Sequence, residues 1–267
     1  MQVKSGVKNR LHAKIRAHLY LRAILTGMED LASYSQEARD LTRGWHFALK
    51  IGVIGGPSTT LVFDDGMIRR SVGPKKRPFG MKLNVRYATY NQFNRFFEGK
   101  IFFPPLFTGN LLHLFKLKKI GKLAALLTHY LKPEAAALED RAFLRRHAQM
   151  TLHALIRSTV IVSGLDPIAQ AALDHFPEGL AVFGIEGQEG VVWVRSLKGQ
   201  LLEGFGQTPS ALPDVRVIFS KPEIVCALAS QKLDTQAAIG KGLLRIEGFA
   251  PLADSIGLVM ERVGEYL

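Results

Sequence analysis

The sequence has a single cysteine and no long apolar run. Cys226 alone cannot form an internal disulfide, and within KPEIVCALAS we predict a buried, unreactive thiol on a helix. The longest apolar runs are broken by Arg22, Arg157 or Gly164, so none reaches the ~20 residues that cross a bilayer. The basic start is not followed by an uninterrupted apolar segment and a small-residue cleavage site, so we expect no secretory signal. Together these absences favour a reducing, cytoplasmic compartment.

Catalytic motifs are also missing from the sequence. Hydrolase elbows, zinc-ligand spacings and kinase loops do not occur. Asp64 and Asp65, in FDDGM, are expected to form a turn between strands and not a catalytic pair. GKGLL at 240–244 has a lysine after glycine but lacks the rest of a phosphate loop. The sequence therefore predicts a protein that is not an enzyme and that uses no cofactor or metal.

The glycine-rich stretch IGVIGGPSTT, residues 51–60, has two possible interpretations. A phosphate cradle needs a strand before the glycines and a helix directly after them, whose free N–H groups bind the phosphates. Here the residues that follow, TTLVFDDG, are typical of a strand, and every second residue from Trp45 to Val53 is bulky and apolar. Strands on both sides favour a hairpin turn in which glycine adopts positive φ.

Positive charge is concentrated in the first half of the chain. The net charge is +12, yet residues 1–135 hold 23 Lys and Arg against 8 Asp and Glu, whereas residues 136–267 hold 12 against 15. This asymmetry indicates a face that meets an anionic partner, either nucleic acid or an acidic membrane surface. A solvated basic surface without a partner is the alternative. The basic residues assigned to this face are Arg69, Arg70, Lys75, Lys76, Arg77, Lys116, Lys118, Lys119 and Lys122.

The two halves of the chain resemble each other in sequence. The aligned pairs are TGMEDLAS at 26–33 with SGLDPIAQ at 163–170, MKLNVRY at 81–87 with PDVRVIF at 213–219, FEGK at 97–100 with ASQK at 229–232, and GNLLHLF at 109–115 with GLLRIEG at 242–248. A repeat of about 133 residues is too long for a solenoid and predicts two complete domains related by duplication. The predicted domains are 1–133 and 134–267.

Each half also shows the same predicted order of elements. A long helix, a short helix, three consecutive strands and a fourth strand cover 8–26, 29–42, 45–53, 59–64, 67–72 and 81–87 in the first half, and 138–163, 166–175, 180–185, 190–197, 200–205 and 214–219 in the second. A helix that Ser220 is placed to cap, a fifth strand and a final helix complete the second half. This order predicts an α+β fold of two similar units, each with an antiparallel sheet of about five strands covered by helices.

Residues 214–248, DVRVIFSKPEIVCALASQKLDTQAAIGKGLLRIEG, resemble the sterol carrier protein type 2 family. The matching positions are Asp214, Val215, Val217, Phe219, Lys232, Leu233, Asp234, Gly242, Leu244, Ile246 and Gly248. With the three strands upstream, the resemblance covers about residues 165–267. The first half resembles the family through its similarity to the second, and it departs from the pattern at IFFPPLFTGNLLHLFKLKKIGK and at Lys82, which stands where Asp214 does.

The resemblance implies an apolar tunnel between sheet and helices that holds a fatty acyl, sterol or isoprenoid lipid. The expected lining residues are Phe183, Trp193, Leu244, Ile246, Phe249, Leu252, Ile256 and Met260 in the second unit, and Trp45, Phe47, Leu49, Phe63, Phe93 and Phe97 in the first. Aromatic and aliphatic residues at these spacings are more often plain core, which is the alternative interpretation.

The sequence thus predicts a non-enzymatic lipid-binding or lipid-transfer protein that associates reversibly with anionic membrane surfaces. A second possibility is an accessory factor that presents a lipid intermediate to biosynthetic enzymes. A third is a basic nucleic-acid-binding protein, in which Phe102, Phe103, Phe107 and Phe115 stack bases between the basic residues. No aromatic signature of an RNA-binding sheet supports the third possibility.

Overall fold

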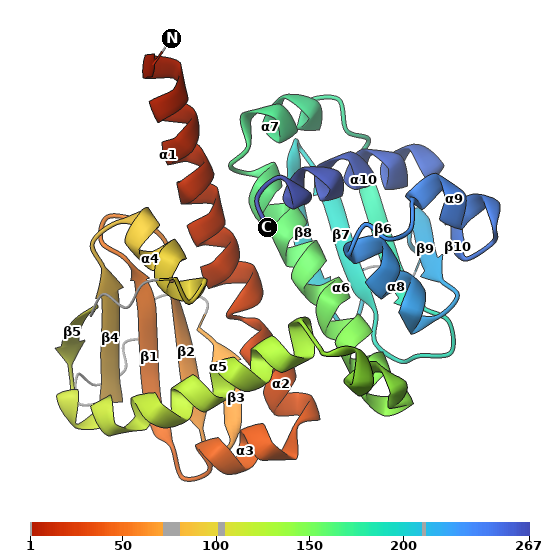
Figure 1. The fold of residues 1–267 in the computed structure, drawn as a ribbon. Coiled ribbons are helices and arrows are strands. Elements are labelled where there is room, and N and C mark those ends of the chain that lie inside the picture. Colours follow the sequence, from red (N-terminus) through yellow and green to blue (C-terminus); the bar gives the residue numbers. More distant parts are fainter. Residues whose placement is uncertain (1, 72–80, 101–104, 210–211) are drawn as a thin grey trace. The chain divides into compact units, whose positions relative to one another are not determined.

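The computed structural model describes residues 2–71, 81–100, 105–209 and 212–267, and only the backbone of residues 2–8. The chain divides into two compact units, Met1–Lys132 and Pro133–Leu267. Both units are α+β, as predicted, and in its described part each contains a five-stranded sheet covered by helices (Figure 1). The predicted membrane-surface residues Lys75, Lys76 and Arg77 lie outside the described residues.

The first unit has the strand order β3-β2-β1-β4-β5. Its strands are β1 (His46–Val53), β2 (Ser58–Asp64), β3 (Met67–Arg70), β4 (Lys82–Tyr87) and β5 (Leu106–Gly109). Its helices are α1 (Gln2–Leu19), which continues into the π-helical turn η1 (Tyr20–Ile24), then α2 (Gly27–Tyr34), α3 (Gln36–Thr42), α4 (Tyr90–Phe97), the 3₁₀ helix η3 (Leu111–Lys116) and α5 (Leu117–Leu131). Figure 1 shows α4 and α5 crossing the same face of this sheet.

The second unit has the corresponding order β8-β7-β6-β9-β10. Its strands are β6 (Gly179–Ile185), β7 (Val192–Leu197), β8 (Gln200–Phe205), β9 (Val215–Phe219) and β10 (Leu244–Gly248). Its helices are η4 (Ala135–Glu139), α6 (Arg141–Ser163), α7 (Pro167–Leu173), α8 (Pro222–Ala229), α9 (Thr235–Gly240) and α10 (Ala250–Gly264). Helices α6, α8 and α10 cover one face of the sheet (Figure 1).

The fourth strand of each sheet returns beside the first and runs parallel to it. Leu49 of β1 lies opposite Leu83 of β4, and Phe183 of β6 lies opposite Val217 of β9. The other strand pairs in the described residues are antiparallel. The sheets are therefore mixed, and the prediction of antiparallel sheets is corrected for one strand pair in each sheet, β1 with β4 and β6 with β9.

Short polar side chains begin several of the helices. Ser35 accepts a hydrogen bond from the Ala38 N–H at 3.2 Å, so the helix predicted over 29–42 is divided into α2 and α3 by the extended backbone at Ser35. Asp234 caps α9 in the same way, through the Ala237 N–H at 2.9 Å. The predicted cap of α8 is wrong, because Lys221 occupies the capping position and provides no side-chain hydrogen bond.

The fifth strand of each unit ends at a glycine in the same geometry. Gly109 has φ +96° and Gly248 has φ +102°. A Cβ atom would lie 2.2 Å from the carbonyl oxygen of Lys82 at Gly109, and 2.3 Å from that of Asp214 at Gly248. Gly109 therefore corresponds structurally to Gly248, and the sequence alignment that placed it on Gly242 is wrong.

One face of each sheet is buried beneath the helices and the other is not. In β4, Leu83 and Val85 are buried, whereas Lys82 and Asn84 are half-buried and Arg86 is exposed. This alternation follows from the two-residue period of a strand. The cores of both units therefore lie between sheet and helices, which is where the resemblance places a lipid.

Candidate functional site

The interior of the second unit brings together most of the residues predicted to line it. Phe183, Leu244, Leu252 and Ile256 belong to one buried hydrophobic cluster, each at most 5% exposed, and the partly buried Ile246 and Met260 pack against it. More partly buried apolar residues around this cluster come from α8, α9, β10 and the turns beside them: Ile224, Cys226, Leu228, Leu233, Ile239 and Leu243. We call these six residues, with Ile246 and Met260, the apolar rim.

Two predicted lining residues of this unit lie elsewhere. Trp193 lies opposite Gly204, where a Cβ atom would be 2.1 Å from the indole ring, and its neighbours Val192 and Val194 belong to the core. Trp193 thus lies on the sheet face away from the cluster. Phe249 is 45% exposed at the start of α10.

In the first unit, four of the predicted residues gather beneath η3. Trp45, Phe47 and Phe63 form an aromatic cluster with ring centroids 5.0 to 5.5 Å apart, and Phe47 and Phe63 are stacked at 10°. Leu49, next on the same face of β1, is 1% exposed. The ring of His113, on η3, lies 4.8 Å from that of Phe47.

The other two predicted residues of this unit form a separate aromatic group on α4. Phe93 is 1% exposed and lies 5.7 Å from Phe97. Phe97 stacks on Tyr20 at 4.6 Å, and Phe93 meets Tyr87 edge-on at 5.4 Å. These ring contacts pack α4 against η1 and against the end of β4.

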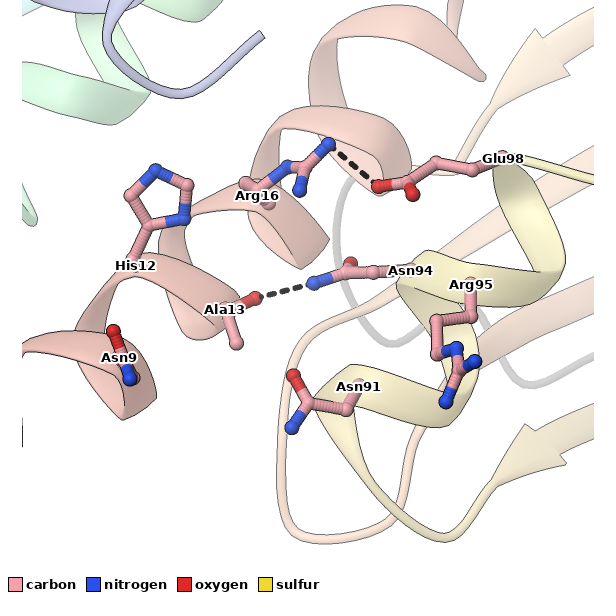
Figure 2. Close-up of a pocket in the computed structure, with 8 residues that line it drawn as sticks. All are labelled: Asn9, His12, Ala13, Arg16, Asn91, Asn94, Arg95 and Glu98. Carbon is pink, nitrogen blue, oxygen red and sulfur yellow. Dashed lines mark hydrogen bonds and ion pairs between the residues drawn. The ribbon is translucent and has the colours of Figure 1, made fainter. Parts of the chain in front are cut away.

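A polar cavity of about 210 Å³ lies between α1 and α4, shown in Figure 2. Its lining residues are Asn9, His12, Ala13, Arg16, Asn91, Asn94, Arg95 and Glu98. Asn94 donates to the carbonyl oxygen of Ala13 at 2.9 Å, while its Oδ1 and the Nε of Arg16 are buried without a hydrogen-bond partner among the described residues. Buried water ordinarily satisfies such atoms. A lining of this polarity does not suit an acyl chain.

Glu98 lines this cavity and carries two ion pairs. Its carboxylate lies 2.5 Å from Arg16 and 2.8 Å from Lys100. Burial alone would raise the pKa of Glu98, but the hydrogen bond from Lys100 and the charges of Arg16 and Lys100 outweigh it and lower the pKa. Glu98 therefore stays ionised and links α1 to α4.

The described basic residues predicted for a membrane surface lie on β3, η3 and α5. Arg69 is exposed on β3, and the backbone of Arg70 donates to the carboxylate of Glu29 on α2. Lys116 turns inward, with its Nζ 4.6 Å from the centre of the Phe47 ring and 5.3 Å from that of Trp45. Burial, and then the charge of Lys119, lowers the pKa of Lys116.

Lys118, Lys119 and Lys122 are exposed on α5, beside apolar residues that were not predicted to belong to a membrane surface. Leu112 is 74% and Phe115 is 73% exposed on η3. Large side chains with this exposure occur at interaction surfaces. These two residues could not be assigned from the sequence because the 3₁₀ conformation of residues 111–116 was not predicted. That conformation determines which side chains point outward and which point inward.

The uncovered face of the first sheet carries a second group of cations. Lys50 lies opposite Asn84, between Lys82 and Arg86 on the neighbouring strand. Burial, and then the charges of Lys82 and Arg86, lowers the pKa of Lys50. Among the described residues of the sheet, these three cations have no ion-pair partner.

The thiol of Cys226 agrees with its predicted unreactive character. It is partly buried on α8, and burial, then the charge of Glu223, raises its pKa to about 11. A thiol with so high a pKa is a poor nucleophile at neutral pH. Within the described ranges, no three His, Cys, Asp or Glu side chains converge as a metal site. None of the described helices is both long and apolar enough to cross a bilayer.

No protein-family model and no curated protein matches this chain. Solved structures do match it. The sterol carrier protein domain 2 of Helicoverpa armigera is 20% identical over 44% of this chain and 91% of that chain, with a TM-score of 0.33. Sterol carrier protein 2 from Yarrowia lipolytica, in its apo form, is 17% identical over 41% of this chain and 86% of that one, with a TM-score of 0.33.

A third match is the UbiJ-SCP2 ubiquinone synthesis protein. It is 16% identical to this chain over 37% of this chain and 82% of that one, with a TM-score of 0.30. All three structural neighbours are domains of the sterol carrier protein 2 type, and each matches less than half of this chain.

Proposed function

We propose that this chain is a non-enzymatic lipid-binding protein, a tandem of two sterol-carrier-like units that arose by duplication. The second unit, alone or together with the first, encloses an acyl, sterol or isoprenoid lipid between its sheet and helices, and the protein associates reversibly with anionic membrane surfaces from the cytoplasm. The resemblance of residues 214–248 to the sterol carrier protein type 2 family supports this proposal.

The observation that carries the proposal is the apolar rim of the second unit. Eight apolar side chains from neighbouring elements are only partly buried, and all of them pack against the core cluster, so an apolar chain placed among them would remain in contact with that cluster. A C16 chain entering this interior gains very roughly 13 kcal/mol gross at ~0.8 kcal/mol per methylene, against ~4 to 15 kcal/mol for association. Burial of an acyl chain gives useful affinity where the association cost lies toward the lower end of that range.

The first test is solvent extraction of the purified full-length protein, followed by mass spectrometry of the lipids. We expect a stoichiometric lipid. Tight, salt-sensitive binding to RNA with no extractable lipid would instead favour a nucleic-acid-binding protein. A carrier exchanges its lipid between vesicles unaided, whereas an accessory factor delivers it only to a biosynthetic enzyme, so a vesicle-to-vesicle transfer assay separates these two roles.

Variants on one helix of the second unit localise the binding. Met260→Lys places a charge at the apolar rim, and we expect it to weaken binding of a fluorescent fatty acid at least tenfold. Leu258→Lys is the matched control, because Leu258 is 59% exposed on the same helix and lies outside the rim. Equal binding by both variants would place the lipid somewhere else.

A further inference from the structure

The outward side of η3 differs sharply from its inward side. In a 3₁₀ helix, side chains three positions apart eclipse each other and form three columns. Leu112 and Phe115 share one column and are 74% and 73% exposed. His113 and Lys116 share the next column, and both contact the ring of Phe47.

The outward column continues into the lysines of α5. Lys118 and Lys119 follow Phe115 by three and four residues, and Lys122 follows them by one further turn, so these side chains lie along one side of the helix. All three lysines are exposed, and the Nζ of Lys119 also lies 5.9 Å from the centre of the Trp45 ring, at the border between the outward and inward sides. From Gly99 to Pro133 the sequence contains no Asp or Glu, so no carboxylate of this segment neutralises them.

We propose that this stripe, formed by Leu112, Phe115, Lys118, Lys119 and Lys122, is a docking surface for anionic lipid bilayers. Apolar side chains followed by lysines match the two layers of a membrane interface. Leucine and phenylalanine enter the acyl boundary by ~5–10 Å, and lysines remain at the level of the phosphate groups. The inference rests on the proposed function, since a lipid carrier has to reach a membrane.

The charges on the stripe argue against two other occupants. A second copy of the chain would bring the same lysines face to face, and like charges across an interface weaken association. RNA accounts for the lysines and for one aromatic ring, but not for Leu112 at 74% exposure. A bilayer with anionic headgroups accounts for both kinds of residue.

The column of η3 formed by His113 and Lys116 contacts the interior of the first unit. The same six residues that present Leu112 and Phe115 outward hold His113 and Lys116 over the aromatic cluster. The proposed docking surface and the segment that covers Trp45 and Phe47 are therefore parts of one short helix.

The test uses the full-length protein and vesicles of phosphatidylcholine with or without phosphatidylglycerol. We compare wild type with Leu112→Ser/Phe115→Ser and with Lys118→Gln/Lys119→Gln/Lys122→Gln. The matched control is Lys50→Gln/Lys82→Gln/Arg86→Gln, which removes the same number of positive charges from the uncovered face of the same unit's sheet. Circular dichroism and thermal unfolding confirm that each variant is folded.

We expect wild type to sediment with the anionic vesicles and to lose binding between about 0.01 M and 1 M salt, as the Debye length falls from about 30 to 3 Å. A lysine near an anionic surface contributes ~1 kcal/mol, or about fivefold, so the α5 triple variant should bind about a hundredfold more weakly. The apolar double variant should lose at least tenfold, and the control only a few-fold.

Three results would overturn the docking surface: equal loss in the two triple variants, wild-type binding by the apolar double variant, or a concentration-dependent dimer that this double variant abolishes. A fluorescent fatty acid added from solution keeps this test separate from the proposed function. If wild type fails to bind the fatty acid yet docks on vesicles through the stripe, the lipid-binding function fails and the docking surface stands. If the fatty acid binds and the stripe variants dock normally, the lipid-binding function stands and the docking surface fails.

Discussion

The Nζ of Lys116 lies 4.6 Å from the centre of the Phe47 ring, so a charged side chain of η3 covers an aromatic interior. An ammonium over an aromatic face at this distance contributes about 0.5–1 kcal/mol where it is exposed, and more where it is desolvated. Burial lowers the pKa of this lysine, so the same position also carries a desolvation cost. A contact with opposing contributions of this size is readily displaced, so the proposed docking of η3 on a bilayer is expected to move Lys116 relative to Phe47.

Trp45 should report that movement. The chain has 2 tryptophans, so Trp193→Phe leaves Trp45 as the only emitter, with Lys116 Nζ 5.3 Å from its ring. Vesicles containing phosphatidylglycerol should change the intensity and wavelength of Trp45 emission, whereas phosphatidylcholine alone should not. No change on adding the anionic vesicles, under conditions where the protein sediments with them, would show that docking leaves η3 in place.

Phe47 distinguishes a packed core from an empty tunnel. It is fully buried and contacts Trp45, Phe63 and His113, so Phe47→Ala should lower the free energy of unfolding by about 3–5 kcal/mol. Denaturant unfolding measures the change. Phe115→Ala, at 73% exposure, is the matched control and should stay within about 0.5 kcal/mol of wild type. A loss at Phe47 as small as that of the control would mean that its ring faces open space.

His18 should make the first unit sensitive to acid. Burial, then the charges of Arg22 and Lys14, lowers its pKa from 6.5 to about 4. Because this pKa lies below the value in the unfolded chain, the unfolded state takes up the proton first. The contribution of neutral His18 to the free energy of unfolding is therefore fully present above pH 6.5. It is lost as the pH falls toward 4, by at most about 1.4 kcal/mol per pH unit.

Thermal unfolding between pH 7 and pH 4 tests this dependence. His18→Gln should flatten the acid branch of the curve. His129→Gln, at an exposed position on α5, is the control for loss of a histidine as such. An acid branch that changes equally in both variants would remove His18 as the cause.

Gly248 should tolerate no side chain. Its φ is +102°, and a Cβ atom would lie 2.3 Å from the backbone oxygen of Asp214, so Gly248→Ala should cost at least about 2 kcal/mol of unfolding free energy. Gly257 lies within α10, and a Cβ atom added there would have no neighbour within 4 Å. Gly257→Ala should therefore stabilise the protein by about 0.5–1 kcal/mol. Calorimetry on both variants measures the contrast, and a neutral Gly248→Ala would contradict the backbone geometry at the end of β10.

Asp166 and Arg262 should couple the helices of the second unit. Nε and Nη2 of Arg262 both lie 2.7 Å from the Asp166 carboxylate, which is 2% exposed and also caps α7 through the Ile168 N–H. Removing Arg262 should cost about 3–5 kcal/mol, because the buried Asp166 carboxylate loses its ion pair, whereas Arg262 left alone is 28% exposed and reaches water. A double-mutant cycle with Asp166→Ala and Arg262→Ala measures the coupling by chemical unfolding. Additive effects would show that the two side chains contribute independently.

The order of elements and the α+β class could be predicted from the sequence. Alternation from Trp45 to Val53 and in VRVIF identified the strands, because a half-covered sheet imposes a two-residue period on its residues. The parallel pairing of β1 with β4 could not be predicted, since local alternation is the same in parallel and antiparallel strands of this kind. Gly109 was aligned with Gly242 because the residue types around those two glycines are similar. The equivalence of Gly109 and Gly248 is visible only in their backbone geometry.

The candidate site was predicted only in part, and the errors have physical causes. Phe183 and Ile256 were placed in the interior by residue type and spacing, and the structure confirms that they are buried there. Trp193 was assigned by its size alone, although a residue between Val192 and Val194 must face the other way. Leu112 was not singled out, and Phe115 was assigned to base stacking and not to a membrane surface, because the three-residue period of a 3₁₀ helix is hard to recognise in a stretch of only six residues.

The parallel pairing of β1 with β4 also has a consequence for biosynthesis. As the first unit leaves the ribosome, β1, β2 and β3 emerge first and can pair as neighbours, but Ala48 can meet Lys82 only after β4 has been synthesised. Until then, the hydrogen-bonding edge of β1 is open to strands of other nascent chains. Truncations that end before β4 should consequently aggregate, whereas those that retain it have this edge protected.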